Sequence, residues 1–135
     1  IRLRPKDYVI GMDIVQEDSN IFVISEYGYG KRTKVSQFTA HKRGGVGIRS
    51  AVVNKKTGQL IGVANLTEEC NEVIIISQQG QTIRLGIKDI SALGRATQGV
   101  RIMRLNEGDS VVSLALVPKI ISELEEASKE DEPNK

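Results

Sequence analysis

Histidine and cysteine, which often serve as metal ligands or nucleophiles, are rare in this chain of 135 residues. His41 is its single histidine and Cys70 its single cysteine, 29 positions apart. These two ligands are too few for a four-ligand zinc site. A Cys–His nucleophilic pair is the remaining catalytic interpretation, but nothing around either residue supports it. We therefore predict no catalytic residue and no metal site, with His41 in a polar loop and Cys70 near the start of a strand.

A glycine-rich stretch at 27–50, YGYGKRTKVSQFTAHKRGGVGIRS, suggests a phosphate-binding loop. The P-loop needs a glycine five positions before its Gly-Lys pair and a Ser or Thr directly after the lysine. Here Ser25 lies five positions before Gly30, and Arg32 follows the lysine. The dinucleotide-binding pattern GxGxxG fails too, because Thr33 replaces its last glycine. The sequence therefore predicts no nucleotide-binding loop.

The composition is that of an ordinary globular domain, with 39% hydrophobic and 27% charged residues. The length predicts one domain. No apolar run reaches 18 residues and no signal-peptide pattern is present, so we expect no membrane span. A single cysteine fits a reducing cytoplasmic location. Because the chain begins with Ile1, we interpret it as a piece of a longer protein.

The net charge of +2 hides an uneven distribution. The tail at 118–135 holds six acidic residues and three lysines, so the remaining chain holds 16 basic and 11 acidic residues, a net of +5. Between Tyr27 and Thr67 there is no Asp or Glu, although eight basic residues lie there. Such a stretch either attracts a polyanion or forms a solvated basic face.

The chain contains an internal repeat of the kind found in blade-like folds. The segments that start at Asn20 and Asn71 align without a gap from Ser25 and Ser77 onward, at an offset of 52. Three arginines and two glycines recur at this offset. The pairs are Arg32/Arg84, Arg43/Arg95, Arg49/Arg101, Gly28/Gly80 and Gly47/Gly99. We expect the recurrent glycines to form turns that need a positive φ.

Each repeat reads as about four short strands separated by turns that contain Gly, Asn or Asp. We therefore predict an all-β fold of propeller-like blades of antiparallel strands, in a partial disc. In each repeat GIRSAVV (47–53) or GVRIMRL (99–105) is one expected strand, and KDIS (88–91) is a candidate helical turn. The predicted units are the end of a preceding blade at 1–18, full blades at 19–69 and 70–117, and an acidic tail at 118–135. We expect a helix over 119–128 and disorder beyond it.

The repeated arginines favour a polyanion as the partner. Equivalent arginines in successive blades would form a rim of cations, which suits the regular phosphates of a curved duplex. The chain has only five aromatic residues and no recognition helix, so we expect backbone contacts to bent double-stranded DNA rather than base reading or single-strand stacking. The alternatives are arginines that brace one blade against the next, and a propeller-like protein-interaction module.

Several motifs resemble the blade repeats of the C-terminal domain of DNA gyrase A. They are DYVIGMDIV (7–15), YGYGKRT (27–33), HKRGGVGI (41–48) and DISALGRATQGVRIMRLNEGDSVVSLALV (89–117). The resemblance implies a β-pinwheel whose blades exchange strands, with this chain as its last two blades. That family's glycine-rich box is Gln, two basic residues, Gly-Gly, a basic residue and Gly. Because His41 and Val46 replace two of its residues, we interpret 41–47 as a related loop.

The resemblance also implies a function. The domain would bind and wrap duplex DNA for an ATP-dependent type II topoisomerase, an isomerase that introduces negative supercoils. No catalytic residue is expected in this piece, and neither is a cofactor, because the cleavage tyrosine, ATP and magnesium belong to other parts of such an enzyme. The implied partners are double-stranded DNA, the rest of gyrase A, and gyrase B in an A2B2 assembly. The implied location is the bacterial cytoplasm, at the nucleoid.

We predict nine residues as DNA contacts. They are Lys31, Arg32, Lys34, Lys42, Arg43, Arg49, Arg84, Arg95 and Arg101. The C-terminal domain of the corresponding topoisomerase IV protein is the alternative within the same class. The acidic tail is a candidate competitor of DNA for the basic surface.

Overall fold

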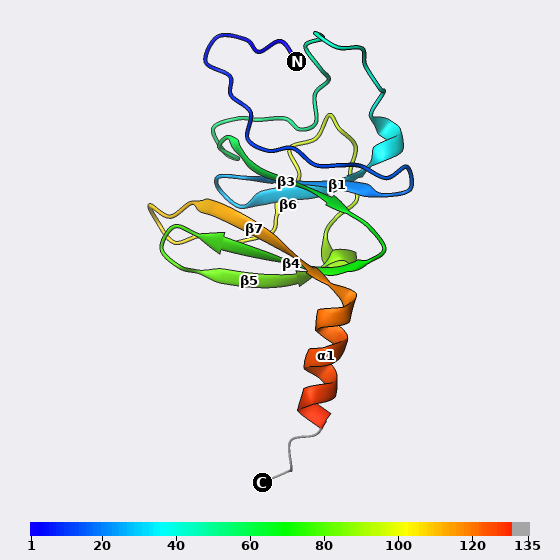
Figure 1. Ribbon diagram of the computed structural model, residues 1–135. Coiled ribbons are helices and arrows are strands. Elements are labelled where there is room, and N and C mark those ends of the chain that lie inside the picture. The colour runs from blue at the N-terminus through cyan, green and yellow to red at the C-terminus, as the bar shows by residue number, and fades with distance from the viewer. Residues whose placement is uncertain (131–135) are drawn as a thin grey trace.

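The computed structural model describes residues 1–130 and contains two antiparallel sheets, one above the other, with a helix extending from the second (Figure 1). The elements in chain order are β1 (Asn20–Ser25), β2 (Tyr29–Lys34), a 3-10 turn η1 (Val35–Gln37), β3 (Leu60–Leu66), β4 (Cys70–Ser77), β5 (Thr82–Gly86), a second 3-10 turn η2 (Ile87–Asp89), β6 (Val100–Arg101), β7 (Val111–Pro118) and α1 (Lys119–Glu130). The predicted all-β fold is confirmed.

Strand β1 is central in the first sheet, whose order is β3-β1-β2-β6. Its run of β-branched and aromatic residues favours a strand buried on both faces. Phe22 and Ile24 are completely buried and face the second sheet, and Val23 is 5% exposed on the other face. This buried strand fixes the positions of the loops that leave the ends of β2.

The second sheet has the order β5-β4-β7 and uses one face for the core. Val73 and Ile75 are completely buried, and Ile74 and Ile76, which alternate with them, are only partly buried. This alternation is expected of a strand with one face against the core. The core lies between the sheets, where Val73 and Ile75 form one cluster with Phe22 and Ile24 of β1.

The two repeats exchange a strand. β6 belongs to the second repeat in sequence but pairs with β2, in the register Tyr29↔Arg101 and Gly30↔Val100. The backbone continues this pairing, because Arg32 donates its N–H to the carbonyl of Ser91 at 3.0 Å. The first sheet therefore receives its fourth strand from the second repeat, as the family resemblance implies.

Two expected strands differ in the structure. Residues 47–53 form no strand, and of 99–105 only Val100–Arg101 does. A strand needs a neighbouring ladder for its N–H and C=O groups. Within residues 1–130 the segment 47–53 makes one such backbone bond, from the Val52 N–H to the Thr97 carbonyl, whereas Val100 and Arg101 pair with the edge of β2.

The opening segment 7–15 forms no strand, although it runs beside β3. The Asp13 carboxylate accepts the N–H of Asn65 at 2.8 Å, and the Ile14 carbonyl accepts the Asn65 side-chain amide at 3.1 Å. These side-chain bonds replace the ladder of a regular sheet.

The repeated glycines behave as predicted. Gly28 and Gly80 have φ of 84° and 87°, and Gly47 and Gly99 have φ of 86° and 82°. Side chains disfavour this region. At Gly99 a Cβ would also lie 2.6 Å from the carbonyl oxygen of Gly30, so the exchanged strand needs glycine there for a second reason.

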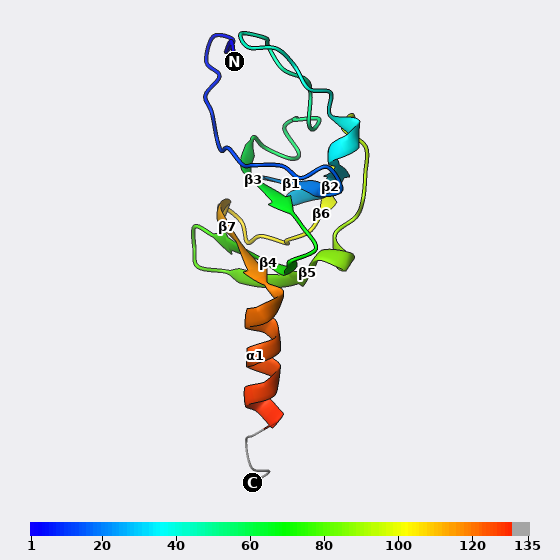
Figure 2. The same cartoon turned by 45° about the vertical axis from the view of Figure 1, so that its right-hand side comes forward.

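The tail begins as a helix that projects from β7 away from the first sheet (Figure 2). The helix expected over 119–128 is present as α1, and the turn expected at 88–91 is present one residue earlier as η2. The disorder expected after the helix falls on 131–135, outside the described residues. No helix within 1–130 is both long and apolar enough to cross a membrane.

Candidate nucleic-acid interface

Two equivalent loops of the repeats lie side by side. We call residues 38–53 and 90–101 the paired loops. The Arg95 guanidinium donates to the Arg49 carbonyl at 3.2 Å, and the Val52 N–H donates to the Thr97 carbonyl at 2.9 Å. Successive repeats therefore present their basic loops on one continuous surface.

The N-terminal segment joins this surface. The N–H of Arg2 donates to the carbonyl of Gly45 at 2.9 Å, and Figure 1 shows this end of the chain beside the first loop. Arg4 and Lys6 follow on the same exposed segment. The sequence reasoning missed these three cations, because a backbone contact across more than 40 positions leaves no local signal. The basic composition of the first six residues was the one available clue.

Lys31 is not available to a phosphate. Its side chain is completely buried, and its ammonium donates to the carbonyls of Gly94, Arg95 and Thr97 at 2.6, 3.0 and 2.9 Å. Burial lowers the pKa of Lys31 from its ordinary value. Lys31 thus anchors the second paired loop through its carbonyls. The sequence had predicted a DNA contact for this residue instead.

Arg32 also braces the repeats. It is half-buried, and its Nε donates to the Ile90 carbonyl of the second repeat at 2.7 Å. This is the bracing alternative that the sequence left open for the repeated arginines. Its remaining guanidinium nitrogens have no protein partner within the described residues.

Arg84 is equivalent to Arg32 but lies in an ion-pair network. Its guanidinium pairs with Glu125 of α1 at 2.8 Å and with Glu72 of β4. Hydrogen bonds to Glu125 and to Glu72 raise the pKa of Arg84. With two carboxylates as partners, Arg84 is a neutralised cation, and it lies on the second sheet rather than on the paired loops.

Arg95 and Arg101 have aromatic partners. The Arg95 guanidinium lies 5.9 Å from the centroid of the Phe38 ring. Arg101 lies 5.4 Å from the centroid of Tyr29 and donates to its hydroxyl at 3.0 Å. Stacking on a ring holds each cation in place and leaves its charge unneutralised.

The other predicted cations are exposed. Lys34 is the last residue of β2, and Lys42, Arg43 and Arg49 lie in the first paired loop. Within residues 1–130 every ion pair involves Arg84, so no carboxylate neutralises these four. The paired loops therefore present unpaired cations, the electrostatic feature that attracts a polyanion.

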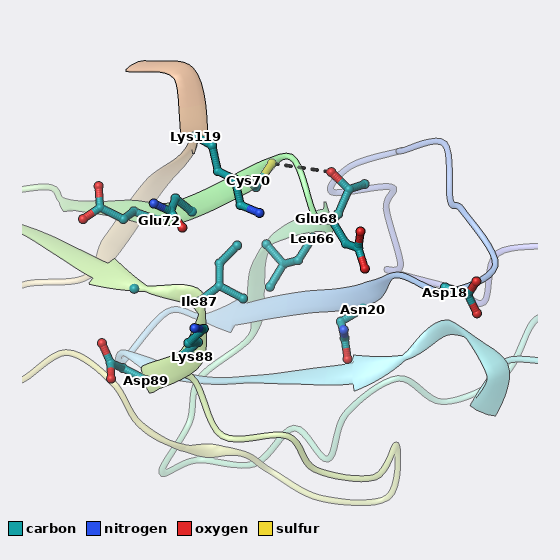
Figure 3. A pocket seen from close by; sticks show the side chains of 13 residues that line it. Asp18, Asn20, Leu66, Glu68, Cys70, Glu72, Ile87, Lys88, Asp89 and Lys119 are labelled. Carbon is teal, nitrogen blue, oxygen red and sulfur yellow. Dashed lines mark hydrogen bonds between the residues drawn. The ribbon is translucent and has the colours of Figure 1, made fainter. Parts of the chain in front are cut away.

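A cleft on another part of the molecule has the opposite character (Figure 3). It measures about 800 Å³ and lies between the two sheets at the Cys70 end of β4. Its charged lining consists of Asp18, Glu68, Glu72, Asp89, Lys88 and Lys119. Within residues 1–130 no group of three His, Cys, Asp or Glu residues is arranged to hold a metal ion. This acidic cleft repels phosphates and lies apart from the paired loops.

Comparison with known families gives two matched segments. The family described as "DNA gyrase C-terminal domain, beta-propeller" matches residues 19–66 and 71–118. The DNA gyrase A protein of Chlamydia trachomatis serovar D is 40% identical over 109 residues, which cover 81% of this chain and 13% of that protein. The DNA gyrase A protein of Staphylococcus aureus (strain NCTC 8325) is 37% identical over 134 residues, covering 98% and 15%. The chain thus spans about a seventh of the length of these curated relatives.

Solved structures show the same fold. A DNA gyrase A C-terminal domain superposes with a TM-score of 0.68 at 28% identity, covering 75% of this chain and 34% of that one. The C-terminal domain of DNA topoisomerase IV superposes with a TM-score of 0.77 at 20% identity, covering 93% and 41%. The second likeness is one of fold alone.

Proposed function

This chain belongs to the DNA gyrase C-terminal domain, beta-propeller family, and from that premise we propose that it binds and wraps duplex DNA through phosphate contacts. The observation that carries the proposal is the pair of equivalent loops side by side, with unpaired cations on both. A row of cations at a regular spacing suits phosphates that repeat regardless of sequence.

The contact residues we propose are the exposed and stacked cations. They are Lys34, Lys42, Arg43, Arg49, Arg95 and Arg101 from the predicted set, with Arg2, Arg4 and Lys6 in addition. The Nε of Arg32 is occupied by the Ile90 carbonyl, so we propose that only its terminal guanidinium nitrogens contact a phosphate. Lys31 and Arg84 support the fold and the tail instead.

Duplex DNA fits this surface better than a single strand. Single-strand binders stack bases on open aromatic rings. Here Phe22 is completely buried, Tyr29 is 6% exposed, and cations lie over the rings of Tyr29 and Phe38. Tyr8 and Tyr27 are 64% and 44% exposed, but neither belongs to the paired loops. The preference among duplex sequences would then come from how easily each one bends.

The wider role we propose is that of the DNA-wrapping part of DNA gyrase A. The bent segment would be presented for passage through a cut segment, which makes ATP-driven negative supercoiling possible. DNA cleavage, ATP hydrolysis and magnesium binding would belong to other parts of that enzyme. The partner would be gyrase B, in an A2B2 assembly located at the bacterial nucleoid. The identity of 37–40% to gyrase A proteins favours this over the topoisomerase IV alternative.

One observation favours the second candidate, a protein-interaction module. Met12 and Ile14 on the N-terminal segment are 93% and 87% exposed, and neighbouring apolar residues extend this patch. Exposed apolar surface of this kind marks a protein contact. Such a contact is compatible with DNA binding on the paired loops, because the two involve different side chains.

The test of DNA wrapping uses relaxed closed circular DNA. The chain is added in increasing amounts, the DNA is nicked and religated, and the linking number is measured after the protein is removed. Wrapping predicts a shift in linking number that grows with protein and disappears at high salt. Salt-dependent duplex binding without any such shift would contradict wrapping while leaving binding intact.

A further inference from the structure

A second cleft lies at the junction of the two repeats, where their hairpin ends meet. We call it the junction cleft. It measures about 730 Å³. Its charged and aromatic lining comes from both repeats and includes Glu26, Tyr29, Lys56, Arg101, Arg104 and Asp109.

Two of its cations share one aromatic ring. Lys56 Nζ lies 5.6 Å and the Arg101 guanidinium 5.4 Å from the centroid of Tyr29. The ring is 6% exposed, so it is a fixed support held by the first sheet. Cation–π attraction to one ring brings together two like charges that would otherwise separate. Arg104 adds a third cation to the same cleft.

The carboxylates of the cleft do not neutralise these cations. Asp109 is 5% exposed, and its Oδ1 accepts the N–H groups of Gln79 and Ser110 at 3.0 and 2.8 Å. Glu26 accepts the N–H of Gln59 at 3.3 Å. In the described part of the chain Lys56, Arg101 and Arg104 take part in no ion pair.

We propose that the junction cleft binds a phosphate group, and that in the complex this is one phosphate of the DNA backbone. The inference rests on the proposed DNA binding and adds to it a contact point at the end of the second paired loop, where Arg101 lies beside Lys56 and Arg104. Its ligand is a phosphate because the cleft gathers three cations that take part in no ion pair within the described residues. Of its two rings, Tyr29 is buried and already has cations over it, and Tyr27 is 44% exposed.

Binding there has a mechanical consequence. Lys56 and Tyr29 belong to the first repeat, and Arg101 and Arg104 to the second. A phosphate held by all three cations would couple the two repeats, so the angle between them would be set by the DNA path as well as by the core.

The test compares two double variants in duplex binding at several salt concentrations. Lys56→Ala with Arg104→Ala removes two cations of the cleft and leaves the Tyr29–Arg101 contact. The matched control, Lys55→Ala with Lys88→Ala, removes two exposed lysines that do not line it. We expect the cleft variant to bind about three- to tenfold more weakly and to lose about one to two units of salt slope. The control should lose clearly less. Equal losses in both variants would overturn the inference.

Two further arms separate the sources of failure. If the unmodified chain shows no salt-dependent duplex binding, the proposed function itself fails. If the chain binds and Lys42→Ala with Arg43→Ala weakens binding, but the cleft variant does not, only the inference about the junction cleft fails.

A separate NMR experiment follows the side-chain N–H signals of Arg101 and Arg104 during titration with a short duplex and, in a second sample, with inorganic phosphate. Shifts with the duplex support the inference, and shifts with inorganic phosphate alone contradict it.

Discussion

Arg32 and Arg84 occupy the same position in consecutive repeats and have different partners. Arg32 donates to the carbonyl of Ile90, which belongs to the next repeat. Arg84 pairs with Glu72 of its own sheet and with Glu125 of the tail helix. Arg32 therefore bonds to the repeat that follows its own. Arg84 has no following repeat in this chain, and helix α1 of the acidic tail supplies one of its partners instead.

This difference predicts unequal effects on stability. Arg32→Ala should lower the free energy of unfolding by about 1–3 kcal/mol, because the partly buried carbonyl of Ile90 loses its charged donor. Arg84→Ala should leave the unfolding midpoint almost unchanged, because its ion pairs are exposed to solvent. Urea unfolding of both variants checks the ranking. A larger loss for Arg84→Ala than for Arg32→Ala would contradict it.

Lys31 should matter for stability rather than for direct DNA contact. Lys31→Met removes the ammonium that bonds Gly94, Arg95 and Thr97, so we expect a loss of about 2–4 kcal/mol in the free energy of unfolding. Lys34→Met, at the exposed end of β2, is the control and should cost under about 0.5 kcal/mol. Similar unfolding midpoints for the two variants would show that the buried ammonium does not anchor the loop.

Asp109 should make the fold sensitive to acid. Burial alone would raise the pKa of Asp109, but hydrogen bonds from Ser77, Gln79 and Ser110 outweigh burial and lower it. A carboxyl with a lowered folded-state pKa stabilises the fold above its unfolded-state pKa. That contribution is lost as the pH falls through the folded-state value. Urea unfolding between about pH 5 and 2 should therefore show a shallower loss of stability for Asp109→Asn than for the unmodified chain. Parallel pH profiles would contradict this assignment.

The acidic tail should compete with DNA for the basic surface. The residues at 118–135 carry a net charge of −3, so their removal makes the remaining chain more attractive to phosphates. Deletion of 119–135 should tighten duplex binding at low salt and have little effect at high salt, where charges are screened. A milder variant, Glu125→Gln, frees Arg84 from one partner and should act in the same direction. Unchanged or weaker binding after deletion would count against competition.

The repeated sequence pattern predicted the strands and turns that local sequence determines. β1 and β4 were predictable from runs of β-branched residues, and the turns at Gly28 and Gly80 from glycines at one offset. The exchange of β6 was expected only through the family resemblance, because pairing across 70 positions leaves no periodic signal.

The individual roles of the cations were the least predictable part. Lys31 and Lys34 look alike in the sequence, yet one is completely buried and the other exposed. The difference arises because Lys31 points to carbonyls more than 60 positions away, on a loop whose path the second repeat determines. Charge density therefore marked a candidate interface, and only the packing of the repeats separated the buried Lys31 from the exposed cations.

The most direct test of the central claim is the salt dependence of duplex affinity with and without the cations of the first paired loop. Lys42→Ala with Arg43→Ala should weaken binding to all duplex sequences alike and lower the slope of log affinity against log salt by about two units. The double variant Lys88→Ala with Lys119→Ala, at the acidic cleft, is the matched control and should keep the full slope. Unaltered affinity and slope in the Lys42/Arg43 variant would contradict DNA binding by this surface.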